Sequence, residues 1–370
     1  MTGSVCPQRG LEKLRPYVPG KPIDEVKREY GLDDIIKLAS NENPLGPSPK
    51  AVEAMAAALP RLNLYPDGRS HDLRQALARR FDVDFAQVAV GNGADDLILQ
   101  LSMAFLEDDD EVVVSRSSFA MYDVYAHAMR ARLIKTPLAA GYRIDLEAMA
   151  DAITDRTKIV YICNPNNPTG TMSPAEEADR FLVRLPDRVL CVIDEAYAEM
   201  VESERYPDSL AMVREGRRNV LVLRTFSKVY GLAGIRLGYA FGPSSIVGTL
   251  AKAKPAFTVN ALAQAAGIAA LEDDDFVRRT IETNRAGRRQ LCGAFDRLGL
   301  EYAESHTNFV LVRIGPTASE IHQRLLERGI IVRPMAGYEL PELLRISIGT
   351  SEQNERFLAA LEDLLATTHA

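Results

Sequence analysis

The segment at residues 224–238 reads RTFSKVYGLAGIRLG and closes an apolar run with a lysine, Lys228. The hydroxyl residues Thr225 and Ser227 precede this lysine, and Arg236 follows it eight positions later. A lysine held among apolar residues can lose its proton and attack a carbonyl group. A lysine after a serine is also common on protein surfaces, where it is only a solvated cation. The motifs in the rest of the chain decide between these two interpretations.

The composition indicates a large globular protein in a reducing compartment. Its 370 residues are 46% hydrophobic, which is enough to bury a large core, and the length favours two domains. The net charge of −7, without a polybasic block, argues against nucleic acid or a membrane as partner. No run approaches 18 apolar residues and no secretion signal is visible, so we expect a cytoplasmic protein.

The cysteines and histidines do not indicate a metal site. Cys6, Cys163, Cys191 and Cys292 are scattered, and no pair has the spacing of metal ligands. Cys163 and Cys191 lie inside apolar runs, which predicts buried free thiols. The five histidines are equally dispersed, so no bound metal is expected.

Short apolar runs alternate with helical patterns over the first two thirds of the chain. The expected strands are QVAV (87–90), EVVVS (111–115), KIVYIC (158–163), VLCVID (189–194), NVLVLR (219–224) and RLGYAFG (236–242). They are apolar throughout, as in strands that are buried on both faces of a sheet. Ser48-Pro49 and the SPAE motif at 173–176 predict helix starts, the second with a capping box. This order predicts an α/β domain with a mostly parallel sheet.

The pattern changes after about residue 255. Two long helical stretches (261–272 and 275–299) precede the expected strands NFVLVRI (308–314), IIVRPM (330–335) and LLRISIG (343–349). We therefore predict a large domain at 46–255, a smaller α+β domain at 256–370, and an N-terminal segment, 1–45, that wraps around them and contributes to the small domain.

Polar motifs follow the expected strands, where ligands gather in an open α/β sheet. They are GNGAD (91–95), SF (118–119), NPNNPTG (164–170), DEAY (194–197) and TFSK (225–228). Taken singly, GNGAD could be a tight turn, NPNNPTG a proline-rich loop and Asp194 a helix cap. GNGAD is not the dinucleotide fingerprint, because Asp96 occupies the third glycine position.

Together these motifs resemble the class I/II aminotransferases, which are fold-type I enzymes that use pyridoxal 5′-phosphate (PLP). The resemblance runs from Leu38 to Thr350 with the motifs in the family's order. It implies a seven-stranded-type, mostly parallel sheet in the large domain and a homodimer to which the N-terminal segment contributes contacts. It also implies a PLP-dependent transaminase.

The resemblance assigns a role to each strand-end residue. Lys228 bonds the cofactor's aldehyde and then moves protons as general acid and base. Asp194 holds the proton on the ring nitrogen, because an opposite charge favours the cationic ring. Asn167 and Tyr197 donate to the phenolate oxygen of the ring. Phe119 stacks on the ring where many relatives have tyrosine, and the proline that precedes it in relatives is absent.

The cofactor phosphate needs N–H donors and positive charge. The resemblance assigns this task to Gly93, Ala94, Asp95, Thr225, Ser227 and Arg236. Tyr65, in the LYPDG motif, matches a tyrosine that reaches the phosphate from the neighbouring subunit. The active site is then shared across the homodimer.

The two ends of the chain, such as residues 14–31, 307–313 and 329–335, resemble the subgroup that exchanges an amino group between histidinol phosphate and 2-oxoglutarate in histidine biosynthesis. The substrate residues implied are Tyr17, Asn41, Tyr122, Asn308, Arg333 and Arg345. A guanidinium fork binds carboxylate or phosphate, so one arginine can serve both half-reactions. For Arg333 a surface ion pair is the alternative, whereas an arginine inside LLRISIG is costly to bury without an anion.

Three other functions stay open from the sequence. The first is an aromatic amino-acid aminotransferase of the same family, since the imidazole and phenyl pockets differ by few residues. The second is a PLP enzyme that cleaves its substrate, and the third is a non-catalytic sensor on the same scaffold. The complete set of Lys228, Asp194, Asn167 and Arg345 argues against the third.

Overall fold

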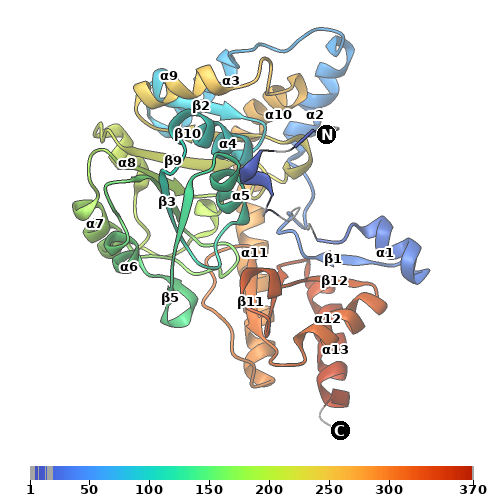
Figure 1. Ribbon diagram of the computed structural model, residues 1–370. Coiled ribbons are helices and arrows are strands. Elements are labelled where there is room, and N and C mark those ends of the chain that lie inside the picture. Colours follow the sequence, from blue (N-terminus) through green and yellow to red (C-terminus); the bar gives the residue numbers. More distant parts are fainter. Residues whose placement is uncertain (1–4, 7, 13, 15–19, 369–370) are drawn as a thin grey trace.

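Seven strands form one large sheet in the order β2-β10-β9-β8-β7-β3-β4 in the computed structural model, which describes residues 5–6, 8–12, 14 and 20–368 (Figure 1). The strands are β2 (Val88–Gly91), β3 (Glu111–Ser115), β4 (Arg132–Thr136), β7 (Thr157–Cys163), β8 (Leu190–Asp194), β9 (Val220–Thr225) and β10 (Gly238–Phe241). Only β10 runs antiparallel to its neighbours. The six strands expected from apolar runs are confirmed. The edge strand β4 was not expected, because three of the five residues in RLIKT are polar and the segment lacks a continuous apolar run.

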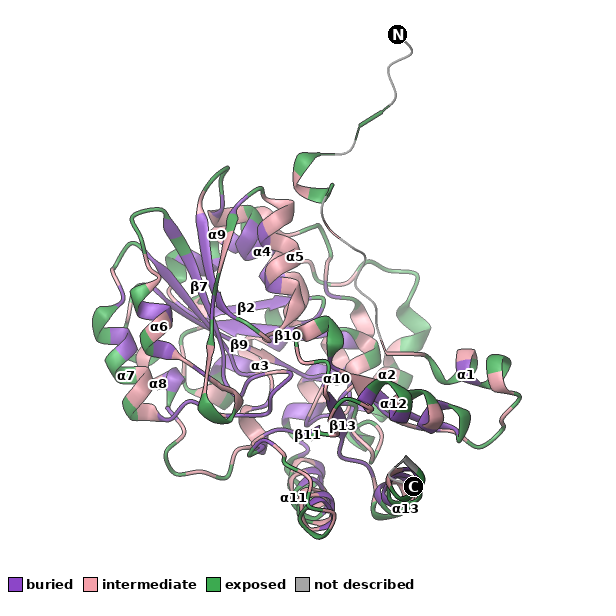
Figure 2. Cartoon of the chain, turned by 60° about the horizontal axis from the view of Figure 1, so that its bottom comes forward, coloured by how far each residue is buried: buried purple, intermediate pink, exposed green. Residues whose placement is uncertain are grey.

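Both faces of this sheet are buried, as the continuous apolar runs require (Figure 2). One face packs against α2 (Pro49–Ala58), α3 (His71–Phe81), α6 (Leu146–Asp151), α7 (Ala175–Arg184), α8 (Ser209–Arg214) and α10 (Ala261–Leu271). The other packs against α4 (Ala94–Phe105), α5 (Ala120–Ala128) and α9 (Ser244–Ala253). Cys163 and Cys191 are buried in β7 and β8 as free thiols, as predicted.

A second, four-stranded sheet has the order β1-β12-β13-β11. Its strands are β1 (Ile36–Leu38), β11 (Phe309–Arg313), β12 (Ile330–Pro334) and β13 (Leu343–Ser347). The helices around it are α1 (Ile23–Tyr30), α12 (Ala318–Glu327) and α13 (Ser351–Thr368). In Figure 1 the blue strand β1 lies beside the red β12, and the two are parallel. The N-terminal segment therefore supplies an edge strand to the smaller domain, although its sequence shows little periodicity.

The helix α11 (Asp274–Arg297) connects the two domains (Figure 1). Val277 and Ile281 pack on the core of the large sheet, whereas Leu291 and Phe295 belong to the core of the small one. The preceding α10 packs on α2 and α3 in the large domain. This packing favours a boundary inside α11, whereas the sequence predicts that the small domain begins at residue 256, and the domain bounds stay a prediction.

Short elements complete the described chain. The strands β5 (Leu138–Ala139) and β6 (Arg143–Ile144) form a hairpin. Single 3₁₀ turns lie at Arg9–Leu11, Leu59–Arg61, Phe85–Gln87, Ala140–Tyr142, Ala198–Met200, Ala233–Ile235 and Ala336–Tyr338. None of the helices in the described residues is long and apolar enough to cross a membrane. Within the same residues no three His, Cys, Asp or Glu side chains converge as a metal site would require.

The two predicted helix starts have different outcomes. Ser48 is the N-cap of α2, and its Oγ accepts from the Ala51 N–H at 3.3 Å. The capping box at 173–176 is wrong, because α7 begins one residue later, at Ala175, with no side-chain cap. Ser173 is held elsewhere: its backbone N–H and carbonyl both bond the side chain of Asn164.

We expect Ser48→Ala to lower the free energy of unfolding by about 1–3 kcal/mol. The buried hydroxyl caps α2 and also donates to the Asp273 carboxylate at 2.6 Å, so the change leaves a buried acceptor without its donor. Urea unfolding followed by circular dichroism measures the loss. Ser245→Ala, at an exposed position of α9, is the matched control and should change the midpoint little. Equal midpoints for both variants would contradict this role of Ser48.

Candidate active site

A cavity of about 280 Å³ lies at the carboxyl ends of the central strands of the large sheet. The predicted residues that line it are Ala94, Asp95, Phe119, Asn167, Asp194, Tyr197, Thr225, Ser227, Lys228 and Arg236. They come from five loops that are far apart in sequence, and the parallel strands bring these loops to one edge. The cavity is therefore the candidate active site.

Lys228 lies three residues after the end of β9 and faces this cavity. Burial lowers the pKa of its ammonium to about 8, and the positive charges of Arg345 and Arg236 act in the same direction. The carboxylates of Glu42 and Asp194 oppose this shift. The Lys228 Nζ lies 5.6 Å from the centre of the Tyr197 ring. A lysine with this pKa is partly neutral near pH 8 and can act as a nucleophile or a base.

Asp194 ends β8 and is only 4% exposed. Its Oδ2 accepts from the Tyr122 hydroxyl at 2.6 Å, and its Oδ1 accepts from the Ala196 N–H at 3.1 Å. Burial raises the pKa of the carboxyl group, and these two hydrogen bonds only partly oppose the effect. In the described residues no cation lies within ion-pair distance of Asp194. The carboxylate can therefore bind a cationic N–H group that enters the cavity.

Tyr197 and Asn167 are oriented as donors toward the cavity. The Tyr197 oxygen accepts from Asn41 Nδ2 at 2.9 Å, so its own O–H remains for another acceptor. The Asn167 Oδ1 accepts from Arg345 Nη1 at 2.5 Å, which leaves the Asn167 amide N–H groups to donate. Burial raises the pKa of the Tyr197 phenol well above its ordinary value, so the phenol stays protonated. The two residues present donors for one negatively charged oxygen.

The first turn of α4 forms an anion-binding end of the cavity. Gly93 is its N-cap with φ +87°, and Ala94 and Asp95 supply the first helical N–H groups. The Arg236 guanidinium packs so closely that a Cβ on Gly93 would lie 2.4 Å from its Nη2. A Cβ on Gly238 would lie 2.1 Å from the Ala94 nitrogen, so β10 also needs a glycine here. The hydroxyls of Thr225 and Ser227 line the same cavity.

Asn41 joins the N-terminal segment to both domains. Besides its bond to Tyr197, its backbone N–H donates to the Ser347 hydroxyl at 2.8 Å, and its carbonyl accepts from Asn308 Nδ2 at 2.9 Å. Arg345, on β13, reaches the large domain through Asn167 and donates to the Ala39 carbonyl at 2.7 Å. These bonds bring residues of the small domain to the rim of the cavity.

The other predicted substrate residues differ in their placement. Arg333 on β12 is paired directly with Arg345 on β13, so the two side chains project from the same face of the small sheet. Tyr122 is 1% exposed, and its hydroxyl faces Asp194 from behind the cavity wall. Asn308 is buried against Asn41. Tyr17 lies outside the described residues.

Tyr65 does not line this cavity within its own chain. It is 82% exposed and stacks on Phe257, with the ring centres 4.6 Å apart. Sequence reasoning missed the wall residues Ser40, Glu42, Cys163, Ala196 and Ala233. Ser40 and Glu42 flank the predicted Asn41, so that motif was the available signal. Glu42 matters because its charge acts on the pKa of Lys228.

The fold and this site define an aminotransferase. Residues 33–361 match the family of aminotransferases of class I and II, and the chain belongs to this family. Its curated relatives include histidinol-phosphate aminotransferases. The protein of that name from Moorella thermoacetica is 47% identical over 359 residues, which are 97% of this chain and 93% of that protein. Histidinol-phosphate aminotransferase 2 from Pseudomonas aeruginosa is 46% identical over 363 residues, 97% of each chain.

Solved structures agree with the fold. The histidinol-phosphate aminotransferase from Sinorhizobium meliloti, in complex with PLP, superposes with a TM-score of 0.89 at 30% identity and covers 99% of each chain. The aspartate aminotransferase from Thermus thermophilus with maleate gives a TM-score of 0.84 at 25% identity, over 98% of this chain and all of that one. The fold is that of the fold-type I PLP aminotransferases, as predicted.

We predict that substitutions of the two charges beside Lys228 shift its pKa in opposite directions. Glu42→Gln should lower the pKa, because it removes a negative charge that stabilises the ammonium. Arg345→Gln should raise it, because a repelling positive charge is lost. NMR of cofactor-free protein, after mild reductive methylation with ¹³C-formaldehyde, reports the titration of this amine, and Lys228→Met assigns the signal. A shift in the same direction for both variants would contradict the electrostatic origin.

Proposed function

We propose that the protein is a histidinol-phosphate aminotransferase, which exchanges an amino group between L-histidinol phosphate and 2-oxoglutarate with PLP as its cofactor. The observation that carries this proposal is that one cavity holds both Lys228, whose pKa is lowered to about 8, and the buried carboxylate of Asp194, which forms no ion pair in the described residues. The relatives named above supply the substrate. Their agreement over 97% of the chain favours histidine biosynthesis.

The residues of the cavity fit PLP group by group. Asp194 can hold a protonated ring nitrogen, and the donors of Tyr197 and Asn167 suit the phenolate oxygen. The helix start at Ala94, together with Arg236, suits the phosphate. When bound, PLP supplies an aldehyde for amino-group exchange and a ring that accepts the electron pair from the substrate carbon.

The side chains of the chain then control the protons. When Lys228 is neutral, its Nζ accepts a proton from the substrate carbon, and the resulting ammonium later donates a proton back. Arg345 and Arg236 keep its pKa low and so raise the neutral fraction near pH 8. Asp194 stabilises the cationic ring, which increases the ring's capacity to accept charge. Tyr122 and the Ala196 N–H fix the orientation of that carboxylate.

Two arginines of the small domain are suited to the anionic end of the substrate. Arg333 and Arg345 lie opposite each other on adjacent strands, and the Arg345 contact with Asn167 places it beside the cofactor cavity. Guanidinium groups bind either phosphate or carboxylate through paired hydrogen bonds. The same pair can therefore receive histidinol phosphate in one half-reaction and glutamate in the other. The second candidate is an aromatic amino-acid aminotransferase, because the same two arginines would also bind the carboxylate of an aromatic amino acid.

The protein is proposed to act as a homodimer with shared sites. An exposed apolar patch, of the kind that marks protein interfaces, lies around Tyr65. Its side chains are Leu59, Leu62, Leu64, Tyr65 and Phe257. Tyr65 extends from this surface and does not reach its own cavity. A second copy of the chain that covers the patch would bring each Tyr65 to the phosphate end of the other copy's site.

We expect steady-state kinetics to show a kcat/KM for histidinol phosphate at least about tenfold above that for phenylalanine. The phosphate carries nearly two negative charges and three acceptor oxygens and so can bond both arginines, whereas the single carboxylate of phenylalanine leaves one of them with a weaker bond; a charge-assisted bond is worth about 1.5–3 kcal/mol. Both donors are assayed with 2-oxoglutarate and the same holoenzyme. A higher value for phenylalanine would replace the proposed substrate by the aromatic one and leave the transaminase assignment intact.

A complementation experiment tests the shared site. Tyr65→Ala and Lys228→Ala should each be nearly inactive alone. In a mixed dimer, one site combines Lys228 of the first chain with Tyr65 of the second and is therefore intact. Mixing after mild unfolding should restore about a quarter of wild-type activity, because half of the dimers are mixed and one of their two sites works. Tyr65→Ala mixed with Asp194→Ala should behave alike, and no recovery in either mixture would refute the shared site.

A further inference from the structure

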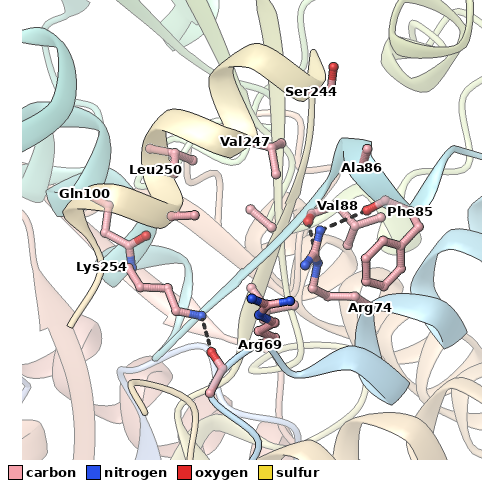
Figure 3. Close-up of a pocket in the computed structure, with 15 residues that line it drawn as sticks. Arg69, Arg74, Phe85, Ala86, Val88, Gln100, Ser244, Val247, Leu250 and Lys254 are labelled. Carbon is pink, nitrogen blue, oxygen red and sulfur yellow. Dashed lines mark hydrogen bonds between the residues drawn. The ribbon is translucent and has the colours of Figure 1, made fainter. Parts of the chain in front are cut away.

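A second cavity, of about 450 Å³, lies at the outer edge of the large sheet, beside its edge strand β2 (Figure 3). Its walls come from β2, from α9, from the start of α3 and from the turn at 85–87. It shares no residue with the candidate active site. The mechanism described above makes no use of it.

Three basic side chains gather at this cavity. Figure 3 shows Lys254, Arg69 and Arg74 on one side, below the helix α9. Lys254 Nζ donates to the Gly68 carbonyl at 2.8 Å. Arg74 donates from Nε to the Val88 carbonyl at 2.9 Å and from Nη2 to the Phe85 carbonyl at 3.0 Å. These contacts hold both cations in place and leave further N–H groups for another acceptor.

Within the described residues no carboxylate forms an ion pair with these cations, although the charge of Asp67 raises the pKa of Arg74 and the charges of Asp67 and Asp96 raise that of Lys254. In the part of the chain that the structure describes, none of the three has a carboxylate oxygen within 4.0 Å. The two acids in the neighbourhood are engaged elsewhere. Asp67 accepts from the backbone N–H groups of Arg69 and His71. Asp96 accepts from the Asn92 N–H, from Gln100 Nε2 and from the Thr258 hydroxyl.

Burial and a neighbouring cation lower the pKa of two of these side chains, Arg74 and Lys254. Burial lowers the pKa of Arg74, and the charge of Arg69 lowers it further. Burial also lowers the pKa of Lys254, with Arg74 acting in the same direction. Like charges that are brought together and partly desolvated carry an unfavourable energy, which an anion between them would relieve.

The opposite wall of the cavity is apolar. Val247 and Leu250 project from α9 toward the space (Figure 3). On the side of the cations, the Phe85 ring lies under the Arg74 guanidinium, with 4.1 Å between Cζ and the ring centre. The volume lies in the range of pockets for small organic ligands. An occupant would need a compact anionic head and an apolar body.

We propose that this cavity is a second binding site, for a small organic anion whose charged head lies between Arg69, Arg74 and Lys254 and whose apolar part lies against Val247 and Leu250. The site is distinct from the substrate site and does not depend on the proposed reaction. Its head group is a phosphate monoester or a carboxylate, and the experiment compares the two.

Isothermal titration calorimetry of the PLP-loaded enzyme with phenyl phosphate, and in parallel with phenylacetate, tests the site. The active-site arginines bind such anions as well, so we expect two classes of site in the unaltered protein. The double variant Arg69→Gln, Lys254→Gln should weaken one class at least tenfold and leave the other unchanged. The double variant Arg79→Gln, Lys252→Gln, at exposed positions of α3 and α9, is the matched control for the loss of two positive charges and should leave both classes intact.

A steric variant separates binding from general electrostatics. Gly248 lies on α9 at the cavity, and an added Cβ would meet no atom within 4 Å. Gly248→Phe should therefore fill the cavity, keep all three cations and abolish the same class of site. The proposal is overturned if the unaltered protein binds each probe at one class of site only. It is also overturned if neither variant changes the binding of the probes. Comparison of the dissociation constants of phenyl phosphate and phenylacetate at this site then identifies the preferred head group.

Discussion

The buried carboxylate of Asp194 is the constraint on which the rest of the site depends. It lies at the end of a central strand, where burial opposes ionisation and the described residues offer only neutral donors, Tyr122 and the Ala196 N–H. A charge in such a position is stable only if a cation completes it. The protonated ring of the cofactor fits this requirement. Lys228, whose pKa is low, and the donors of Tyr197 and Asn167 line the same cavity and would surround such a ring.

The second feature is that the donors are oriented from outside the large domain. Asn41 fixes the Tyr197 oxygen, and Arg345 fixes the Asn167 amide. Both are contributed by segments that belong to, or lead from, the small sheet. The orientation of Tyr197 and Asn167 therefore depends on hydrogen bonds from outside the large sheet. Arg345 in addition lowers the pKa of Lys228, so the residue proposed to bind the substrate would also tune the reactivity of the amine.

Much of this arrangement could be predicted from the sequence, because the strands that carry the site are apolar throughout and end in distinctive polar motifs. Lys228, Asp194 and Asn167 were placed correctly at one edge of the sheet. The strand β1 and the role of Glu42 could not be predicted, since a three-residue strand has no period and the effect of Glu42 acts through space. The predicted capping box at Ser173 was wrong because the side chain of Asn164, nine residues earlier, forms hydrogen bonds with the backbone N–H and carbonyl of Ser173.

The connection between the domains has a mechanical consequence. Over residues 20–368 the chain passes between them twice, once through the segment 39–48 after β1 and once through the continuous helix α11. These two connections define an axis, so rotation of the small domain about the line that joins them would be easier than translation along the large domain. Asn41, which has a positive φ of 56°, lies in the first of these connections, the segment 39–48. A swing there would carry Arg345 toward or away from Asn167 and so open and shut the mouth of the site.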